Sequence, residues 1–245
     1  MRFENLLGDP LEIARWMLFA SGVRLSLSYR ERLPRARATV IVSNHRSFLD
    51  APLLMAAVSR PIHFACHHYL GQVPIVADLV RSLGCFPLNQ PERRSRSFFR
   101  QAIGYLQAHR TVGIFPEGTT SMLKPPAPFH LEAFHRGFAH LALRAPIEEL
   151  AILPIAIASH QETSDRAVPL RLLRWFDPSE PLFDQPGWHP AVTYQRVNVL
   201  VGRPIWITSQ QRAHYQGRQA SGLVTDITQT CYDEITSLLR QGSYS

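Results

Sequence analysis

Short apolar segments alternate with longer amphipathic segments along most of this chain, and this alternation constrains its fold more than any other feature. Each apolar segment is short and bounded by turn residues, which favours a strand over a buried helix. Strands are predicted at 39–43, 62–66, 85–88, 111–115, 150–158 and 196–201. Helices are predicted at 51–58, 73–83, 95–109, 136–144 and 221–239. Because strands that alternate with helices form parallel sheets covered on both faces, the sequence predicts an α/β fold with a mostly parallel central sheet flanked by helices.

One segment interrupts the alternation. Residues 160–194 contain five prolines, namely Pro169, Pro178, Pro181, Pro186 and Pro190. We expect this segment to form a long irregular insertion over the core. The chain contains no internal repeat, so the economical interpretation is one domain over residues 35–245, preceded by an N-terminal segment over residues 1–34.

The N-terminal segment carries an amphipathic helical pattern that follows Pro10 and runs from Leu11 to Leu27. A helix of this kind lies in a membrane interface when its apolar face enters the acyl boundary and its arginines meet head groups. The same pattern fits a helix packed on its own domain. Four arginines just downstream favour the membrane, namely Arg30, Arg32, Arg35 and Arg37.

Basic residues are concentrated in the first half of the chain. Residues 1–125 contain 16 basic and 8 acidic side chains, whereas residues 126–245 contain 10 and 11. This asymmetry indicates an anionic partner, which could be nucleic acid, anionic lipid or a phosphorylated substrate. Aromatic residues are not interleaved with the basic ones and no recognition motif is present, so nucleic acid is not expected.

Three other properties of the chain bound its location. No run of about 18 uncharged apolar residues occurs, so a membrane-spanning helix is not expected. The first residues include Glu4, Asp9 and Glu12, which do not fit a signal peptide. The three cysteines, Cys66, Cys85 and Cys231, form no CxxC pair, which fits a reducing compartment.

The sequence NHRSFLD follows the first predicted strand directly and contains His45 and Asp50. In a parallel sheet, the loop that leaves the carboxyl end of a strand lines the ligand crevice. Asp50 begins the next helix and could serve as its N-cap. It could equally orient the His45 ring and make it a general base.

The sequence FPEGTTS follows another predicted strand and brings polar groups to the same edge of the sheet. Pro116 and Gly118 favour a tight turn, and Glu117 contributes a carboxylate. Thr119, Thr120 and Ser121 contribute hydroxyl groups. Taken alone, this segment is typical of a polar β-turn.

Together, the two segments resemble the glycerolipid acyltransferase family that includes 1-acylglycerol-3-phosphate acyltransferases. Asn44, His45 and Asp50 match its NHxxxxD motif, and residues 115–119 match its FPEGT motif. Weaker matches follow the same order along the chain, at residues 84–88, 136–138, 153–155 and 201–205.

The resemblance implies a reaction and a set of site residues. His45, oriented by Asp50, would remove the proton from an acceptor hydroxyl, which attacks the thioester of acyl-CoA or an acyl carrier protein. No metal or bound cofactor is implied. The substrate-binding residues that it implies are Asn44, Arg46, Ser47, Arg93, Glu117, Gly118, Thr119, Thr120, Ser121 and Arg136.

The chain departs from the family's pattern in three places. Thr120 stands where an arginine is common, and Gln90 stands where another is expected, although Arg93, Arg94 and Arg96 follow closely. Cys66, His67 and His68 occupy a place where the family has a lysine. Arginine makes bidentate phosphate contacts that threonine does not make. These departures therefore bear on the identity of the acceptor more than on the reaction.

We therefore expect a peripheral enzyme of phospholipid synthesis on the cytoplasmic side of an anionic membrane. Its acceptor is expected to be 1-acylglycerol-3-phosphate. The alternatives are another lysophospholipid, glycerol-3-phosphate or an aminoacyl lipid. The competing hypothesis is a non-catalytic basic module that binds membranes or nucleic acid.

Overall fold

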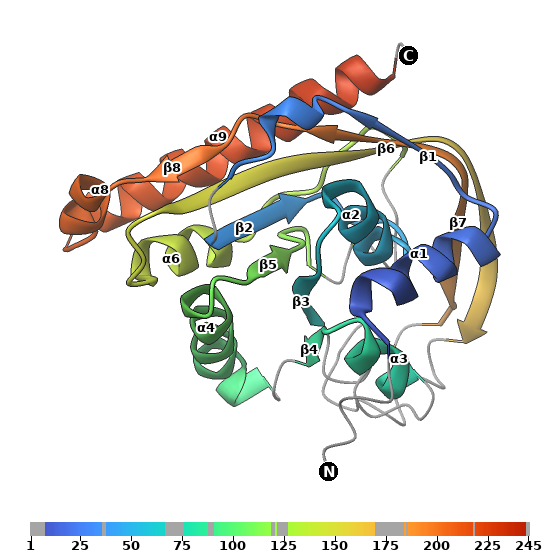
Figure 1. The fold of residues 1–245 in the computed structure, drawn as a ribbon, viewed down its shortest axis with the longest axis horizontal. Helices are drawn as coiled ribbons and strands as arrows, with labels where there is room; N and C mark the ends of the chain where they lie inside the picture. Colours follow the sequence, from blue (N-terminus) through green and yellow to red (C-terminus); the bar gives the residue numbers. More distant parts are fainter. Residues whose placement is uncertain are drawn as a thin grey trace.

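A sheet of eight strands forms the centre of the molecule in the computed structural model (Figure 1). The model describes residues 8–35, 38–66, 76–87, 91–118, 121, 127–169, 184, 186–217 and 219–243. The strands are β1 (Arg24–Ser28), β2 (Ala38–Ser43), β3 (Ile62–Cys66), β4 (Phe86–Pro87), β5 (Thr111–Ile114), β6 (Leu150–Pro169), β7 (Trp188–Val201) and β8 (Ile205–Ile207). The helices are α1 (Pro10–Ala20), α2 (Asp50–Val58), α3 (Val76–Ser82), α4 (Pro91–Gln107), α6 (Gly137–Arg144), α8 (Ser209–His214) and α9 (Gln219–Gly242), with a 3₁₀ turn η2 (Arg30–Arg32).

The sheet is mostly parallel, which confirms the predicted fold class. Its strand order is β1-β7-β6-β2-β5-β3-β4, and β8 pairs with β6 outside this path. The pairs β2–β5, β2–β6, β3–β5, β3–β4 and β1–β7 are parallel. Only β7 and β8 run antiparallel to β6 among the described strands.

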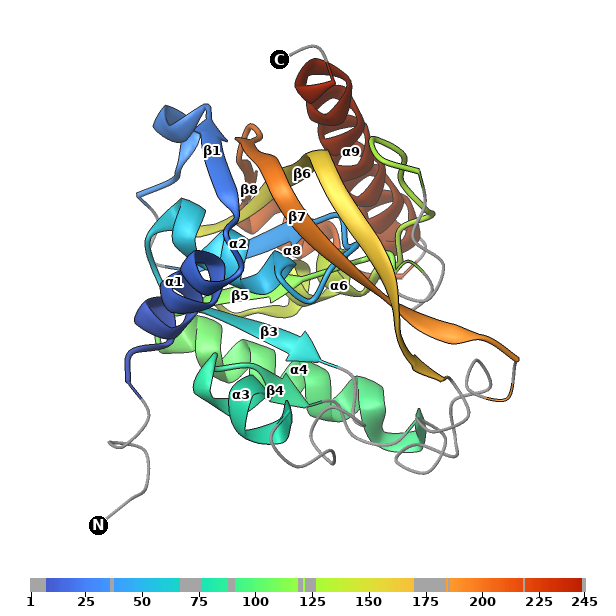
Figure 2. The ribbon, with the colours of Figure 1, turned by 90° about the vertical axis from the view of Figure 1, so that its right-hand side faces the viewer.

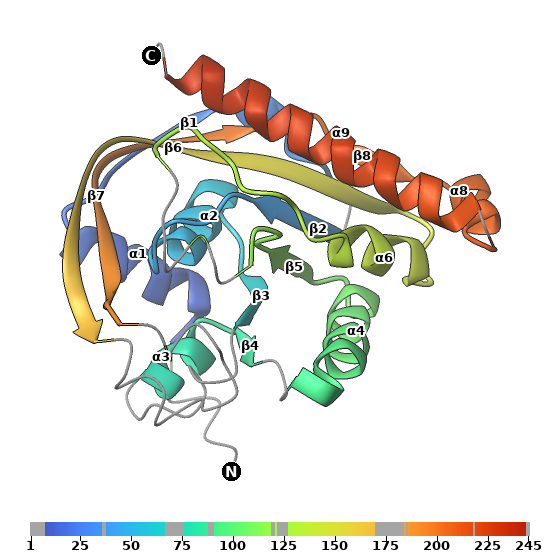
Figure 3. The same cartoon turned by 180° about the vertical axis from the view of Figure 1, so that it is seen from behind.

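Helices cover both faces of the sheet (Figures 1 and 3). In β2, Val40 and Val42 point into a core shared with α4, α6 and α9, whereas Ile41 points into a core shared with α1 and α2. All three side chains are fully buried. A strand buried on both faces reads as a continuous apolar run, and the segment TVIVS was recognisable for this reason.

The irregular insertion predicted over residues 160–194 is wrong for residues 160–169 and 188–194, which lie in strands. β6 continues to Pro169 and pairs antiparallel with β7, so the two strands form a ribbon that extends beyond the sheet (Figure 2). β1 pairs with β7 only over Arg24–Ser28, opposite Arg196 to Leu200. Pro190 therefore lies in the two-stranded part of the ribbon, where a proline is tolerated. Residues 170–183 and 185 of the predicted insertion lie outside the described residues.

The helix predicted from Leu11 to Leu27 is wrong beyond Ala20. Gly22 adopts a φ of +66°, and the chain then enters β1. Leu25 and Leu27 fit the helical pattern and also the alternation of a strand, and parallel pairing with β7 decides between them. α1 itself packs on the domain through Leu11, Ala14 and Leu18.

Smaller differences concern the ends of elements. α4 begins at Pro91, because proline suits the first turn of a helix. β8 and α8 were not predicted. Residues 73–75 of one predicted helix and residue 88 of one predicted strand lie outside the described residues.

Gly113 in β5 faces the ring of Phe64 in the neighbouring strand. A Cβ at residue 113 would lie 2.1 Å from Cε1 of Phe64. We predict that Gly113→Ala lowers the free energy of unfolding by about 1–3 kcal/mol, because the buried ring has to move. Gly104→Ala is the control, since nothing lies within 4 Å of a Cβ placed at residue 104. This substitution should raise the free energy of unfolding by about 0.5–1 kcal/mol, because alanine favours helix α4 over glycine. Urea unfolding of both variants measures the difference, and equal stability would contradict the close contact.

Candidate active site

Two loops meet at the carboxyl edge of the sheet. Residues 44–49 leave β2, and residues 115–118 leave β5. Because β2 and β5 are parallel neighbours, with Val42 opposite Ile114, the two loops emerge side by side. The ribbon of β6 and β7 lies next to them (Figures 1 and 2). The carboxyl-end rule thus holds for both segments.

His45 and Asp50 form a hydrogen-bonded pair at this edge of the sheet. Nδ1 of His45 lies 2.8 Å from Oδ2 of Asp50. The Asp50 side chain is completely buried, whereas the His45 side chain is 18% exposed. Asp50 Oδ2 also accepts the backbone N–H groups of Arg46 and Ser47, at 2.7 and 2.8 Å. An oxygen that accepts two N–H groups assigns the shared proton to Nδ1 and leaves Nε2 of His45 as an acceptor.

The second oxygen of Asp50 has a different partner. Oδ1 accepts a hydrogen bond of 2.7 Å from the hydroxyl of Tyr194, which lies on β7 and is fully buried. Burial and the adjacent Asp50 carboxylate raise the pKa of Tyr194 well above its usual value. Helix α2 has Leu49 as its N-cap residue and has no side-chain cap. The N-cap interpretation of Asp50 is therefore wrong.

Aromatic rings fix the plane of the His45 ring. Phe115 stacks on it with a centroid separation of 4.0 Å and an interplanar angle of 8°. Phe64 stacks on Phe115 in turn, at 4.9 Å and 7°. Gly113 leaves room for the Phe64 ring. The stack of the Phe64, Phe115 and His45 rings therefore depends on the absence of a side chain at residue 113.

Glu117 links the two loops through its carboxylate. Oε1 accepts the N–H of His45 and Oε2 accepts the N–H of Glu132, both at 2.9 Å. Burial raises the pKa of Glu117 above its ordinary value, although these two hydrogen bonds lower it in part. Its described contacts make Glu117 a connection between the loops.

The other predicted site residues near the first loop are bonded to strands β6 and β7. The amide of Asn44 donates to the carbonyl of Ile157 and accepts from its N–H, which joins β2 to β6. The guanidinium of Arg46 forms a partly buried ion pair with Glu162 on β6. The hydroxyl of Ser47 donates to the carbonyl of Val192 and accepts from the N–H of Leu49. These contacts anchor the loop to the ribbon.

The second loop turns sharply at Gly118, whose φ is +72°. The buried hydroxyl of Ser121 donates to the Gly118 carbonyl at 3.1 Å. The N–H of His135 donates to the Pro116 carbonyl, which brings the start of α6 to this loop. Arg136 follows and is exposed as the N-cap residue of α6. The predicted residues Thr119 and Thr120, the side chain of Arg93, and Gln90, His67 and His68 lie outside what the structure describes.

Two residues of the site were not found from the sequence. Tyr194 and Glu162 lie in the segment that its prolines marked as irregular. The alternation of the apolar residues Val192 and Tyr194 with polar Thr193 and Gln195 is a sequence signal that could have revealed the strand.

The fold and the site together define an α/β protein with a buried His–Asp pair at the carboxyl edge of its sheet. The family model of the Acyltransferase family matches residues 24–158, and the chain belongs to this family. No arrangement of three or more His, Cys, Asp or Glu side chains that could hold a metal ion occurs in the described part of the chain. No helix within the same residues is long and apolar enough to cross a membrane.

Two curated proteins are similar to part of the chain. A 1-acyl-sn-glycerol-3-phosphate acyltransferase of Borreliella burgdorferi is 26% identical over 110 residues, which are 44% of this chain and 43% of that protein. A chloroplastic 1-acyl-sn-glycerol-3-phosphate acyltransferase of Arabidopsis thaliana is 26% identical over 136 residues, which are 55% of this chain and 36% of that protein. The matches thus span less than half the length of these relatives.

A solved structure shares the fold. The crystal structure of the 1-acyl-sn-glycerophosphate acyltransferase PlsC from Thermotoga maritima has a TM-score of 0.60 with this chain. It covers 95% of this chain and 77% of its own, at 17% sequence identity.

The hydroxyl of Tyr194 provides a test of the buried carboxylate. We predict that Tyr194→Phe lowers the free energy of unfolding by about 1–3 kcal/mol, since a buried oxygen of Asp50 loses its donor. Tyr29→Phe is the matched control, because its hydroxyl bonds to Gln241 at the surface, and it should cost less than about 0.5 kcal/mol. Chemical unfolding gives both values. Equal losses of stability would contradict a stabilising role of the Tyr194 hydroxyl at the buried Asp50 carboxylate.

Proposed function

We propose that this protein is an O-acyltransferase that moves a fatty acyl group from a thioester to the hydroxyl of a lysophospholipid. The observation that carries the proposal is the 2.8 Å contact between His45 Nδ1 and the fully buried Asp50 carboxylate. Membership of the Acyltransferase family and the names of the similar proteins support it.

In this proposal His45 is the catalytic base. Nε2 takes the proton of the acceptor hydroxyl as its oxygen attacks the thioester carbonyl. The C–O bond forms, the C–S bond breaks, and the leaving thiolate receives the proton from the imidazolium. Asp50 holds the ring and stabilises the imidazolium. No acyl-enzyme, metal or bound cofactor takes part, and the donor is acyl-CoA or an acyl carrier protein.

The surrounding groups act on the reaction through His45. The Phe115 ring lies parallel to the imidazole at 4.0 Å and limits its rotation. Glu117 fixes the backbone of His45, and Tyr194 fixes Asp50. We assign positioning roles to these groups, because preorganised geometry of a base lowers the barrier for proton transfer.

We propose 1-acylglycerol-3-phosphate as the acceptor. Its phosphate needs a cation or N–H donors near the second loop, and Thr120 in place of the family's arginine supplies no charge. Arg136 is the N-cap residue of α6 and follows His135, which contacts this loop. We therefore assign Arg136 to the acceptor phosphate, because the preceding residue, His135, lies against the Gly118 turn.

Replacement of His45 tests the chemistry. We predict that His45→Ala lowers the rate of acyl transfer from acyl-CoA to lysophosphatidic acid by about 100-fold to 10,000-fold, the contribution of a general base. His214→Ala, an exposed histidine on α8, is the control and should keep full activity. Thermal unfolding of both variants checks that they fold. Undiminished transfer by a folded His45→Ala variant would disprove the mechanism.

A panel of acceptors then tests the substrate. Lysophosphatidic acid, lysophosphatidylcholine, glycerol-3-phosphate and an aminoacyl lipid are compared with each donor in turn. The highest kcat/KM is expected for lysophosphatidic acid. If another acceptor gave a higher kcat/KM and its acylation were lost in His45→Ala, the proposed reaction would stand and the proposed acceptor would be wrong.

We also propose that α1 attaches the protein peripherally to an anionic membrane. Trp16 and Phe19 are 67% and 77% exposed and touch edge to face, with ring centroids 5.7 Å apart. Leu11, Ala14 and Leu18 face the opposite way, into the core. The helix thus packs on its domain by one side and offers two aromatic rings on the other, which suits insertion at a bilayer interface.

Substitution of the two rings tests this attachment. We predict that Trp16→Ser combined with Phe19→Ser weakens binding to vesicles of phosphatidylcholine and phosphatidylglycerol at least about tenfold, because apolar burial is lost. Trp206→Ser is the control, since Trp206 is 49% exposed on β8. Vesicle sedimentation measures binding, and unchanged binding of the double variant would place the membrane contact elsewhere. Substitutions are preferable to a truncation through residue 30, which would also remove β1.

A further inference from the structure

A hollow of about 360 Å³ lies at the amino edge of the sheet, opposite the edge that holds His45. It is bounded by the start of α1, by the turn between α2 and β3, and by the turn between α4 and β5. Pro10 and Thr111 line it together with four basic side chains, namely Arg60, His63, His109 and Arg110.

The guanidinium of Arg60 is half-buried beside this hollow. Its Nη2 lies 3.5 Å from the hydroxyl of Thr39, which is a long contact. Its Nε is buried and has no hydrogen-bond partner among the described residues. Burial lowers the pKa of Arg60, and no carboxylate offsets this effect. Because a partly buried cation without a counter-ion is less well solvated than an exposed one, the environment favours an anion at this place.

No acidic side chain in the described part of the chain forms an ion pair with Arg60 or Arg110. In this part of the chain, the arginines that form ion pairs with carboxylates are Arg15, Arg32, Arg46, Arg81 and Arg203. Asp9 precedes Pro10 in the chain, and its carboxylate accepts the N–H of Leu11 as the cap of α1. All side chains in the lining of the hollow that can carry a charge are therefore basic.

His63 adds a further polar group. Its Nδ1 lies 2.8 Å from the carbonyl of Gly84, and a carbonyl only accepts, so Nδ1 carries a proton. Its ring stacks on Tyr105 at 4.0 Å, which fixes its plane. Burial, and then the nearby charge of Arg110, lower the pKa of His63, so an anion in the hollow would favour its charged form.

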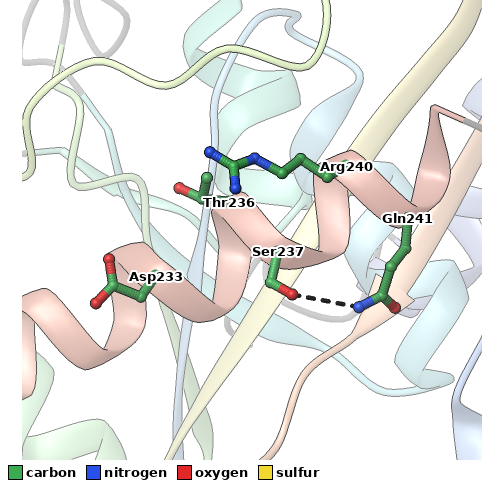
Figure 4. A pocket seen from close by; sticks show the side chains of 5 residues that line it. All are labelled: Asp233, Thr236, Ser237, Arg240 and Gln241. Carbon is green, nitrogen blue, oxygen red and sulfur yellow. Dashed lines mark hydrogen bonds between the residues drawn. The ribbon is translucent and has the colours of Figure 1, made fainter.

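A second hollow, of about 470 Å³, provides a comparison. Its lining side chains all come from α9 and include both Asp233 and Arg240 (Figure 4). Ser237 and Gln241 in this lining are hydrogen-bonded to each other at 3.2 Å. Because acid and base are both present, this lining has no excess charge to attract an anion.

The basic hollow is remote from the proposed reaction. The six-residue strand β2 runs from the amino edge to His45, a span of about 20 Å. The phosphate and hydroxyl of one lysophospholipid head group cannot reach both edges. A ligand in the hollow is thus a different molecule from the acceptor.

We propose that the hollow formed by Arg60, His63, His109 and Arg110 is a second site, which binds a phosphate group carried by a lipid head group or by a free phosphorylated molecule. The two arginines supply charge-assisted hydrogen bonds to the phosphate oxygens. The Nε2 atom of His63 supplies another donor once it is protonated.

The first experiment uses the full chain and inorganic phosphate as the probe. Thermal unfolding is followed as phosphate is added at constant ionic strength. We expect the Tm of the unmodified protein to rise with phosphate, and the apparent Kd to increase about tenfold or more in Arg60→Gln and in Arg110→Gln. Arg240→Gln, from the α9 hollow, should behave as the unmodified protein. Arg110 is exposed, so its variant remains informative if Arg60→Gln fails to fold. The proposal would be overturned if phosphate did not raise the Tm of the unmodified protein, or if both variants kept its apparent Kd.

The second experiment separates the two sources of the phosphate. The same variants are sedimented with phosphatidylcholine vesicles that contain or lack phosphatidic acid. A loss of binding to the phosphatidic acid vesicles in Arg110→Gln assigns the site to a lipid head group. Unchanged vesicle binding, with the loss of the phosphate effect, assigns it to a free phosphorylated molecule. A raised KM for acyl-CoA or lysophosphatidic acid in Arg110→Gln would place these residues in the substrate site and overturn the separate site.

Discussion

The buried carboxylate of Asp50 is the group around which the site is organised. An ionised carboxylate in the interior costs several kcal/mol unless donors surround it. Asp50 receives the backbone N–H groups of two loop residues, the Nδ1–H of His45 and the hydroxyl of Tyr194. These donors come from the loop after β2 and from β7, so one carboxylate fixes the loop conformation, the histidine ring and the position of the ribbon together.

The sequence predicted His45, Asp50 and Glu117 because a simple rule applies to them. Each lies directly after a buried apolar strand or at the start of the next helix, and parallel strands bring such positions to one edge. Tyr194 and Glu162 escaped prediction because prolines normally break strands, whereas a two-stranded ribbon tolerates them. The pattern of Leu25 and Leu27 fits two periodicities, and only the presence of β7 as a partner selects the strand. The missing information was in each case a contact distant in the chain.

The structure separates the arginines of the first half of the chain into those with a carboxylate partner and those without one among the described residues. Arg46 is neutralised by Glu162, and Arg32 lies near Glu234 and over the ring of Tyr29. Both guanidinium groups thus have a carboxylate partner within the protein. Arg60 and Arg110 at the amino edge have no such partner among the described residues. The charge of the first half of the chain therefore indicates an anionic partner only after its ion pairs with carboxylates of the second half have been subtracted.

The length of β6 has a consequence for how the protein is made. Its first residues pair with β2 and its last ones extend into the ribbon, so a single strand joins the core to the site. The bond between Asp50 and Tyr194 closes a loop of 144 residues. During synthesis from the N-terminus, this bond cannot form before residue 194 has left the ribosome, and contacts of such long sequence separation form slowly. The matched family region ends at residue 158, so a nascent chain of that length would contain both motifs and still lack an assembled site.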